Sequence, residues 1–545
     1  MKKLPIGIED FKKLIDKDCY YVDKTALISN VIDDEVALYS RPRRFGKTLN
    51  MSMLYYFFSN KEAANAYLFD GLEITKNPEA MKHQNKYPVI FISLKDMKQN
   101  NFASQLTKFA SCIARLAIDN KELLDSDDLM VYEKEIFQQY LSRSASVELL
   151  QEALLNISIY LEKHYHQKVI VLIDEYDVPL QSAYLQGYYD EMSNFIGGAF
   201  SSLLKTNSAL EKGIMTGCLR IAKESIFTGL NNFVVYSIFD EFASTYFGFT
   251  QSEIDQMLEA YDSTKHREEI KEWYDGYLFG STEMYNPWSC LNAIKALSLP
   301  SGKCQGYWAN TSGNDIVYKY IQDGNANLKD EFKQLIKGKT VTKTIVSELT
   351  YREMDEIDNI YSFLLFTGYL KIVNELENNQ YELAIPNKEV LEIYTFSFNK
   401  WFKKIVDHAS HDFYEALLNE NVDDATDILS DVLYDSISYF DYGEKFYHGL
   451  VLGMLSDYNP KSNQESGLGR YDLIVMKSTL RKRGIVLEFK YSDKLENLEN
   501  DAKIAVKQIV EKEYITGLKR KGYKDIIGYG ISFYQKFCYI CKLEE

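Results

Sequence analysis

Two short apolar runs near the C-terminus place two acids and one base close together. The runs are GRYDLIVM, which contains Asp472, and GIVLEFKY, which contains Glu488 and Lys490. Successive side chains of a strand point to opposite faces, so Glu488 and Lys490 share one face. The turn KSTLRKRG can fold the first strand back and bring Asp472 beside them. The sequence therefore predicts a hairpin with a charged cluster on one face.

This cluster has the composition of a metal-dependent hydrolytic site. The carboxylates of Asp472 and Glu488 can bind a hard divalent cation, Mg²⁺ or alternatively Mn²⁺, and the cation lowers the pKa of a bound water. Lys490 would orient that water or neutralise charge on a phosphate. This is the chemistry of phosphodiester hydrolysis. The alternative is an ordinary amphipathic hairpin with an exposed salt bridge.

A second motif lies in EVALYSRPRRFGKTLNMSMLYYFF, where an apolar strand leads into a basic loop and then a helical pattern. In such an arrangement loop amides and a helix N-terminus bind phosphates. Lys47 would reach the terminal phosphates, and Thr48 would place its hydroxyl on Mg²⁺. The usual formula begins with a glycine, where this chain has Arg41, so the match is degenerate. The loop's candidate nucleotide-binding residues are Arg41, Arg43, Arg44, Gly46, Lys47 and Thr48.

Two further runs support a nucleotide site. In KVIVLIDEYDVPL an apolar stretch ends at Asp174 and Glu175, as in a Walker B strand with a Mg²⁺-linked Asp and a Glu that activates water. A buried parallel strand is also a continuous apolar run, which is the alternative interpretation. In GIMTGCLRIAKESIF, Thr216 and Arg220 occupy positions suited to a phosphate sensor and a cationic finger.

These motifs occur together with YYVDKTALI, TGLNNF, WYDGYLFG, YNPWS and YWANTSG. In this order they resemble a bacterial family in which an AAA-like ATPase domain is fused to a C-terminal PD-(D/E)XK nuclease. The resemblance covers essentially the whole chain, and RPRRFGKT is typical of the family, so Arg41 is a family trait. It implies that Glu444 and Gln508 flank the nuclease site. His448, four residues after Glu444, is either close to the metal or a structural histidine.

A chain of 545 residues is expected to form two to four domains. Strand-like runs alternate with helical stretches over residues 1–245, which predicts a parallel α/β P-loop NTPase domain. Residues 246–400 are mainly helical and include a helix followed by a hairpin, the outline of a winged helix. Winged helices bind DNA or serve as spacers, and the acidic turn ELENNQ favours a spacer. Residues 401–545 would supply the PD-(D/E)XK nuclease-like α/β domain.

Charge and composition limit the partners. The net charge of −17 argues against a nonspecific polyanion binder as a whole. Residues 461–545, however, carry 17 basic and 12 acidic residues, a net charge of +5, which is compatible with local nucleic-acid binding. The N-terminus has no apolar signal region and no long apolar run occurs, so neither secretion nor membrane insertion is expected. Seven scattered cysteines suit a reducing cytoplasm.

The sequence thus predicts a cytoplasmic, ATP-binding, Mg²⁺-dependent nuclease whose nucleotide state controls cleavage of nucleic acid, DNA in preference to RNA. ATP hydrolysis is expected to be slow, because Arg41 replaces a glycine and adds a cation near the phosphates. A homo-oligomer is compatible with the resemblance, since AAA-like sites are often completed by a neighbour's arginine. Two alternatives stay open: a nucleotide-dependent switch or scaffold with a vestigial nuclease fold, and a nuclease with a vestigial P-loop domain.

Overall fold

The computed structural model describes residues 2–219, 233–299, 301–308, 315–349, 351–436, 444–462, 465–466, 469–476, 483–520 and 522–544. The chain separates into two compact units. The first comprises Met1–Asn314 with Gly338–Ile393, and the second comprises Asp315–Lys337 with Tyr394–Glu545. The division into three domains at residues 245 and 400 stays a prediction.

The first unit contains a five-stranded parallel sheet with the order β2-β3-β4-β1-β5. Its strands are β1 (Val36–Ser40), β2 (Val89–Ser93), β3 (Val169–Asp174), β4 (Leu210–Gly217) and β5 (Phe233–Tyr236). Every residue of β1 and β3 is buried, as expected of strands covered on both faces. Since all strands are parallel, their carboxyl ends lie at one edge of the sheet. The predicted parallel α/β domain is confirmed.

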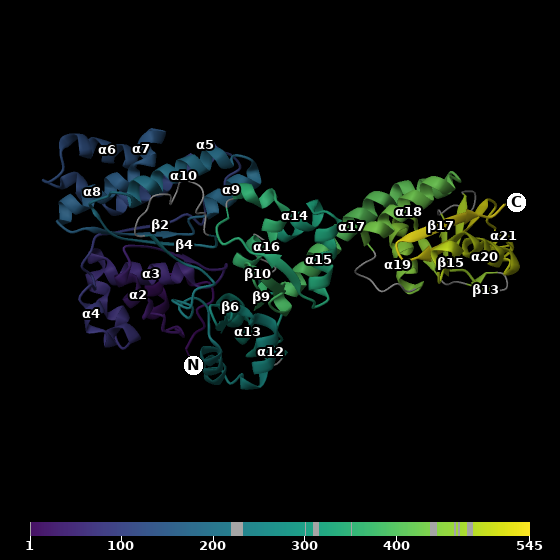
Figure 1. Ribbon diagram of the computed structural model, residues 1–545, viewed down its shortest axis with the longest axis horizontal. Helices are drawn as coiled ribbons and strands as arrows, with labels where there is room; N and C mark the ends of the chain where they lie inside the picture. Colours follow the sequence, from purple (N-terminus) through teal and green to yellow (C-terminus); the bar gives the residue numbers. More distant parts are fainter. Residues whose placement is uncertain are drawn as a thin grey trace. The chain divides into compact units, whose positions relative to one another are not determined.

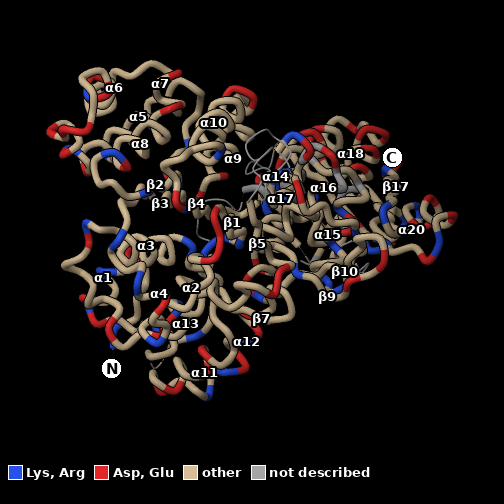
Figure 2. The backbone as a smooth tube through the Cα atoms, turned by 60° about the vertical axis from the view of Figure 1, so that its left-hand side comes forward, with Lys and Arg blue, Asp and Glu red and all other residues tan. Residues whose placement is uncertain are grey.

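Helices cover both faces of this sheet (Figures 1 and 2). One layer contains α1 (Phe11–Asp16), α2 (Leu27–Asp33), α3 (Lys47–Phe58) and α4 (Pro78–Met81). The other contains α5 (Phe102–Asp119), α6 (Val131–Ser142), α7 (Val147–Gln151), α8 (Ala153–Tyr165), α9 (Val178–Gln186) and α10 (Tyr189–Leu204). The loops after the strands therefore connect to helices of both layers at the carboxyl edge.

A small helical core follows the sheet. Its elements are α11 (Gln251–Ala260), α12 (Arg267–Tyr274), β6 (Tyr277–Phe279), β7 (Thr282–Met284) and α13 (Pro287–Leu297). Buried side chains of the helices form one apolar cluster, against which Leu4, Ile6, Tyr20 and Val22 pack. The N-terminal segment and the helices after the sheet are thereby held together. Asn286 of the YNPWS motif caps α13 by accepting from the Ser289 amide at 3.2 Å.

The predicted helix and hairpin are present in residues 338–393. Helix α16 (Ile357–Phe366) precedes β9 (Lys371–Glu375) and β10 (Gln380–Ala384), and β8 (Val341–Thr344) completes a sheet of order β8-β10-β9. The β9–β10 turn contains Asn378 and Asn379 at φ 61° and 56°, the left-handed conformation that tight hairpins require. Whether this segment is a spacer or binds DNA stays a prediction.

The second unit is built on a mixed sheet of order β11-β14-β15-β16-β17. Its strands are β11 (Pro460–Ser462), β14 (Leu473–Met476), β15 (Gly484–Tyr491), β16 (Ile526–Tyr534) and β17 (Phe537–Lys542), and β12 (Glu465–Ser466) pairs separately with β13 (Gly469–Arg470). Its helices are α14 (Asp315–Asp323), α15 (Ala326–Ile336), α18 (Val422–Ser436), α19 (Glu444–Met454), α20 (Leu498–Glu511) and α21 (Tyr514–Arg520), together with residues 394–418 of α17 (Lys388–Leu418), whose first turns belong to the first unit. The order α19, three-stranded meander, α20, β16 is the expected nuclease core.

The two faces of β15 pack against different helices. Ile485, Leu487 and Phe489 join the core formed with α17, α18 and α19. Val486 packs with Ile509 of α20 and belongs to the opposite face. Glu488 and Lys490 follow the register of Val486, so they face α20. No helix in the described part of the chain is both long and apolar enough to cross a membrane.

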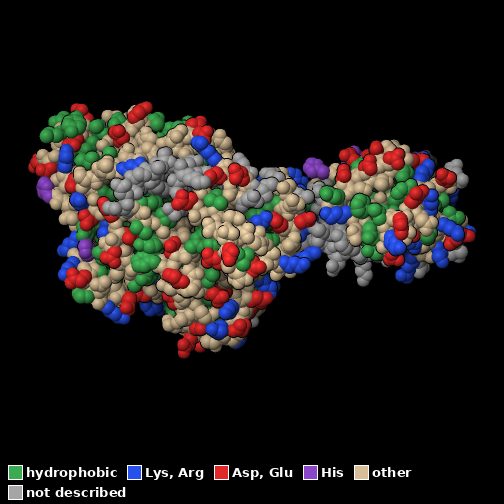
Figure 3. All heavy atoms as spheres, viewed as in Figure 1, with side chains coloured by type: hydrophobic (Ala, Val, Ile, Leu, Met, Phe, Trp, Pro, Cys, Tyr) green, Lys and Arg blue, Asp and Glu red, His purple; other side chains and the backbone are tan. Residues whose placement is uncertain are grey.

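Charged side chains of both signs are interspersed over the faces seen in Figure 3.

Glu389, in the first turn of α17, is a buried carboxylate of the first unit. Its carboxylate accepts from the Ser289 hydroxyl at 2.7 Å and from the amides of Tyr307 and Trp308 at 2.7 and 2.8 Å. Burial raises the pKa of Glu389 to about 7. The YWANTSG motif thus begins with two amides that hold the start of α17.

Protonation of Glu389 makes the stability of the first unit depend on pH. Its pKa rises from 4.5 to about 7 on folding, so the contribution of Glu389 to stability is greatest below pH 4.5 and falls as pH rises towards 7. At about 1.4 kcal/mol per pKa unit, the loss is on the order of 3 kcal/mol. Glu389→Gln keeps an oxygen for both amides and should flatten this dependence, which chemical denaturation from pH 4.5 to 7.5 would measure. An unchanged slope in Glu389→Gln would contradict the assignment.

Candidate nucleotide and nuclease sites

The basic loop joins β1 to α3 at the carboxyl edge of the parallel sheet. Gly46 immediately precedes α3 and has φ 83°, a conformation that glycine adopts without steric cost. Helix α3 begins at Lys47, so its first free amides point into the space beside the loop. The sequence motif thus forms the strand, loop and helix N-terminus that phosphate binding requires.

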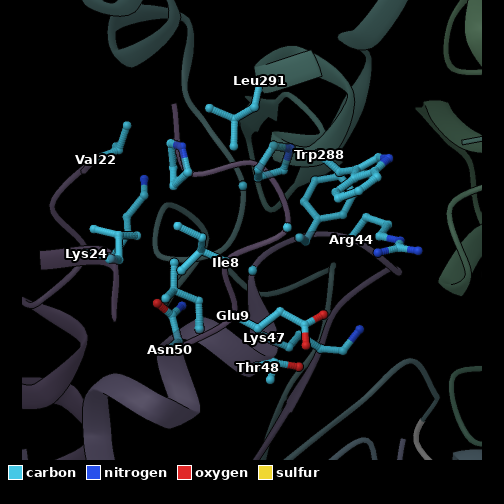
Figure 4. A pocket seen from close by; sticks show the side chains of 18 of the residues that line it. Ile8, Glu9, Val22, Lys24, Arg44, Lys47, Thr48, Asn50, Trp288 and Leu291 are labelled. Atoms are coloured by element: carbon cyan, nitrogen blue, oxygen red, sulfur yellow. The ribbon is translucent and has the colours of Figure 1, made fainter. Parts of the chain in front are cut away.

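A cavity of about 290 Å³ opens beside this loop. Figure 4 shows Lys47 and Thr48 at one end and Val22 and Leu291 at the other. The far wall comes from the N-terminal segment, α11 and α13, and includes the apolar side chains Ile8, Val22, Phe249, Met257, Trp288 and Leu291. The cavity therefore joins a charged end to an apolar end, and both belong to the first unit.

Asp174, the last residue of β3, gathers three hydroxyl groups. It accepts from Thr216 at 2.7 Å, Thr48 at 2.9 Å and Ser93 at 3.0 Å. Burial and then the neighbouring Glu175 raise the pKa of Asp174. The structure thus brings together Thr48, Asp174 and Thr216. Ser93 was missed, although its place at the end of the run PVIFIS could have identified it.

Lys47 and Glu175 face each other at the charged end of the cavity. The Lys47 ammonium donates to the carbonyls of Arg41 and Pro42 at 3.1 and 3.0 Å, and lies 3.4 Å from Oε1 of Glu175. Burial lowers the pKa of Lys47, but interactions with Glu175, Asp177 and Asp174 help to outweigh burial, so its pKa exceeds its ordinary value. Glu175 has φ 55°, a costly backbone conformation that clusters at functional sites.

Asp177 is a buried acid that sequence reasoning missed. Its Oδ2 accepts from the amides of Cys218 and Leu219 at 2.8 and 3.2 Å, directly after β4. Burial, followed by the charge of Glu175, raises the pKa of Asp177 to about 6. Asp177 therefore holds the segment that leads towards Arg220. Arg220 itself lies outside the described residues, so its role as a cationic finger stays a prediction.

Arg41 does not face the cavity, which corrects its interpretation as a phosphate-facing cation. Its guanidinium is fully buried and donates to four carbonyls, those of Ser40, Tyr236, Ser237 and Ala243, at 2.8 to 3.1 Å. It also lies over the ring of Phe279 at 5.2 Å. Burial lowers the pKa of Arg41 to about 10, so it stays charged at neutral pH. Arg41 thus ties the loop to the segment after β5.

The other two arginines of the loop do line the cavity. Arg43 donates to the side-chain oxygen of Gln181 on α9. Arg44 lies over the ring of Trp288 on α13, 4.6 Å from its centroid, in cation–π geometry. They place positive charge along the cavity wall, and their contact with a nucleotide stays a prediction.

In the second unit, Asp472 and Glu488 lie opposite each other on neighbouring strands. Leu473 of β14 pairs with Leu487 of β15, and the antiparallel register brings the next two residues together. The Asp472 amide lies 3.4 Å from Oε2 of Glu488, and the Phe489 amide donates to Oδ2 of Asp472 at 2.8 Å. The two carboxylates are therefore adjacent at one end of the hairpin.

Gln508 of α20 links the base to the acids. Lys490 donates to Oε1 of Gln508 at 2.7 Å, and Nε2 of Gln508 donates to Oε1 of Glu488. Near this group, Nε2 of His448 lies 3.0 Å from the Asp472 carbonyl, as expected of a structural histidine. Glu444 begins α19, but its side chain is outside the described set, so its role stays a prediction.

The donor set suits a cation that keeps much of its water. No group of three or more His, Cys, Asp and Glu side chains that could hold a metal occurs in the described part of the chain. Mg²⁺ is often held by one or two carboxylates, with waters and substrate phosphates completing its shell. Asp472 and Glu488 match this requirement in the second unit, as do Thr48 and Asp174 in the first.

Comparison with known proteins assigns each site's part of the chain to a family. Residues 5–227 match the AAA-ATPase-like family described as predicted AAA-ATPase, and residues 442–543 match a family of the PD-(D/E)XK nuclease superfamily. The chain is also 27% identical over 395 residues to an Azotobacter chroococcum mcd 1 protein described as uncharacterized and located in the vnfD 5' region. That match covers 71% of this chain and 68% of the relative.

The chain therefore carries an AAA-ATPase-like domain and, C-terminal to it, a domain of the PD-(D/E)XK nuclease superfamily. This confirms the resemblance found in the sequence. Together the two domain families point to an ATPase and a nuclease.

Restoring the usual glycine at position 41 should destabilise the first unit. Arg41→Gly leaves buried carbonyls without a donor, and hydrogen bonds to a charged group contribute about 1.5–3 kcal/mol each, so we expect a loss of about 3 kcal/mol or more. Chemical denaturation of the full chain would measure it. Arg44→Gly is the matched control, because Arg44 is exposed and has φ 69°, which favours glycine. Equal stability of the two variants would contradict the structural role of Arg41.

Proposed function

We propose that this protein is an ATP-binding, metal-dependent nuclease that hydrolyses phosphodiester bonds in nucleic acid under control of its nucleotide state. The observation that carries the proposal is the continuous chain of contacts from Lys490 through Gln508 to Glu488 and Asp472. An ordinary exposed salt bridge would not bury Glu488, whose exposure is 2%. DNA is the proposed substrate and the cytoplasm the proposed location.

The nuclease residues have distinct roles in this proposal. Asp472 and Glu488 would hold Mg²⁺ or Mn²⁺, which supplies a bound water of lowered pKa. Gln508 fixes one oxygen of Glu488 and orients the Lys490 ammonium. Lys490 then positions the attacking water or neutralises charge on the phosphate. The Phe489 amide keeps Asp472 turned towards its partner on β15.

The nucleotide site uses contacts that rearrange when phosphate enters. Lys47 would exchange the carbonyls of Arg41 and Pro42 for the terminal phosphates. Thr48 and Asp174 would hold Mg²⁺. Thr216, which contacts Asp174, would act as the phosphate sensor. Glu175 is the proposed base for the attacking water.

Slow hydrolysis needs a reason other than the one drawn from the sequence, because Arg41 faces away from the cavity. The Glu175 carboxylate lies 3.4 Å from the Lys47 ammonium. Lys47 therefore has to turn to the phosphates before the Glu175 carboxylate leaves this ion pair and can contact the attacking water. We therefore keep slow turnover as part of the proposal. A homo-oligomer completed by a neighbour's arginine is likewise proposed.

Lys47→Ala should weaken Mg²⁺-ATP binding about tenfold or more while the fold survives, because the phosphates lose a charge-assisted hydrogen bond. Glu175→Gln should retain ATP binding but lose turnover. Calorimetry and phosphate release would measure the two effects. Unchanged affinity in Lys47→Ala, or full turnover in Glu175→Gln, would remove that residue from the proposed site.

Asp472→Ala, Glu488→Ala and Lys490→Ala should each abolish metal-dependent cleavage, and the triple variant should be hardly worse, because residues that act as one unit have non-additive effects. Cleavage of single- and double-stranded DNA and RNA would be measured with Mg²⁺ or Mn²⁺, with and without ATP. Lys494→Ala, an exposed lysine four residues after Lys490, is the control. Cleavage that persists in Asp472→Ala would contradict the assignment of Asp472 to the nuclease site.

The same measurements separate the alternatives. ATP binding without cleavage under any condition would indicate a switch or scaffold. Cleavage that is indifferent to ATP and to Lys47→Ala would indicate a nuclease whose P-loop domain has no controlling role.

A further inference from the structure

Lys98 is a cavity-lining cation that belongs to none of the sequence motifs. It lies in the loop after β2, on the cavity wall that also includes Lys47, Arg43 and Glu175. Among the residues that the structure describes, none makes a hydrogen bond or ion pair with its ammonium group. Its neighbour Lys95 differs, because it also lines the cavity but is paired with Glu9 at 2.5 Å. In this loop, Lys95 is neutralised by an ion pair, whereas Lys98 has no ion-pair partner among the described residues.

The electrostatic surroundings of Lys98 favour an anion. Partial burial and the nearby charges of Arg43 and Arg44 lower the pKa of Lys98, and Glu175 and Asp96 only partly offset them. Like charges held at one cavity end repel each other until an anion enters between them. A phosphate bound there would interact favourably with all three cations.

The loop that carries Lys98 is held firmly. The carbonyl of Gln99 accepts from the hydroxyls of Ser182 and Tyr188 at 3.3 and 2.6 Å. Its amide donates to Oε1 of Gln105, whose Nε2 in turn donates to the Met97 carbonyl at 2.8 Å. The Lys98 backbone is therefore fixed on both sides. A fixed backbone limits the positions its ammonium can reach, as a specific phosphate contact requires.

We propose that Lys98 binds the terminal phosphate of a nucleoside triphosphate and makes the cavity prefer a triphosphate to a diphosphate. This inference rests on the proposed nucleotide site. Lys47 and Glu175 mark where the terminal phosphate and the attacking water would lie. Lys98 lines the same cavity from the loop after β2, and its charge interacts with Arg43 and Glu175, so this loop adds a cation to those of the P-loop. A diphosphate bound at the P-loop leaves the Lys98 position unfilled.

The test compares the affinities of two nucleotides for the full chain. Calorimetry with Mg²⁺ would measure ADP and the non-hydrolysable ATP analogue AMP-PNP for the wild type, Lys98→Ala and Lys98→Arg. Lys168→Ala is the matched control, because Lys168 is exposed directly before β3 and so lies at the opposite edge of the sheet. Circular dichroism would establish that each variant melts like the wild type.

Lys98→Ala should weaken AMP-PNP binding about tenfold or more and ADP binding by less than about threefold, since a hydrogen bond to a charged group is lost only with the triphosphate. Lys98→Arg should restore most of the preference, and Lys168→Ala should change neither affinity. If Lys98→Ala lost the same affinity for AMP-PNP and for ADP, or lost no affinity for either, the proposed role of Lys98 would be overturned. If Lys47→Ala still weakens binding in that case, the nucleotide site stands. A wild type that binds neither nucleotide would overturn both proposals.

Discussion

Parallel pairing of β1, β3 and β4 is the constraint on which the first unit depends. Strand β4 lies between β1 and β3, and all three end at the same edge. Thr48 after β1, Asp174 on β3 and Thr216 on β4 meet only because of this alignment. If one strand were reversed, Asp174 would lose its hydroxyl donors and would remain a buried acid without compensation. The hydrogen bonds of the sheet therefore also fix the chemistry at its edge.

In the second unit, strand pairing also brings the acidic residues of the site together, but the two residues are closer in the sequence. Asp472 and Glu488 become neighbours through one antiparallel register, and α20 contributes Gln508 across the face of β15. A shift of the hairpin by one residue would turn Glu488 towards the apolar core of α17 to α19. Because side chains alternate along β15, one face packs into the apolar core, and the charged side chains lie at the end of the other face. The geometry of the proposed nuclease site and the packing of the core depend on the same register.

Local patterns in the sequence identified what depends on local structure. The glycine before α3, the apolar run ending at Asp174 and the alternation around Glu488 each lie within a few residues. Within the first unit Thr48 contacts Asp174, and within the second Gln508 contacts Glu488. Arg41 could not be placed in this way, because two of its acceptors, Ser237 and Ala243, lie 196 and 202 residues further on. Lys98 and Asp177 were missed for a related reason. Lys98 belongs to no motif. Asp177 lies in the run KVIVLIDEYDVPL, but its partners Cys218 and Leu219 are 41 and 42 residues further on.

The guanidinium of Arg41 also has a consequence for the entropy of binding. A glycine-rich phosphate loop is mobile when empty and loses that freedom when a ligand orders it. Here the first position of the loop is anchored through four carbonyls before any ligand arrives. Rigidity in the binding conformation reduces the ordering that association has to impose. A loop of this kind should bind phosphate with a smaller entropic penalty than its glycine-rich counterparts.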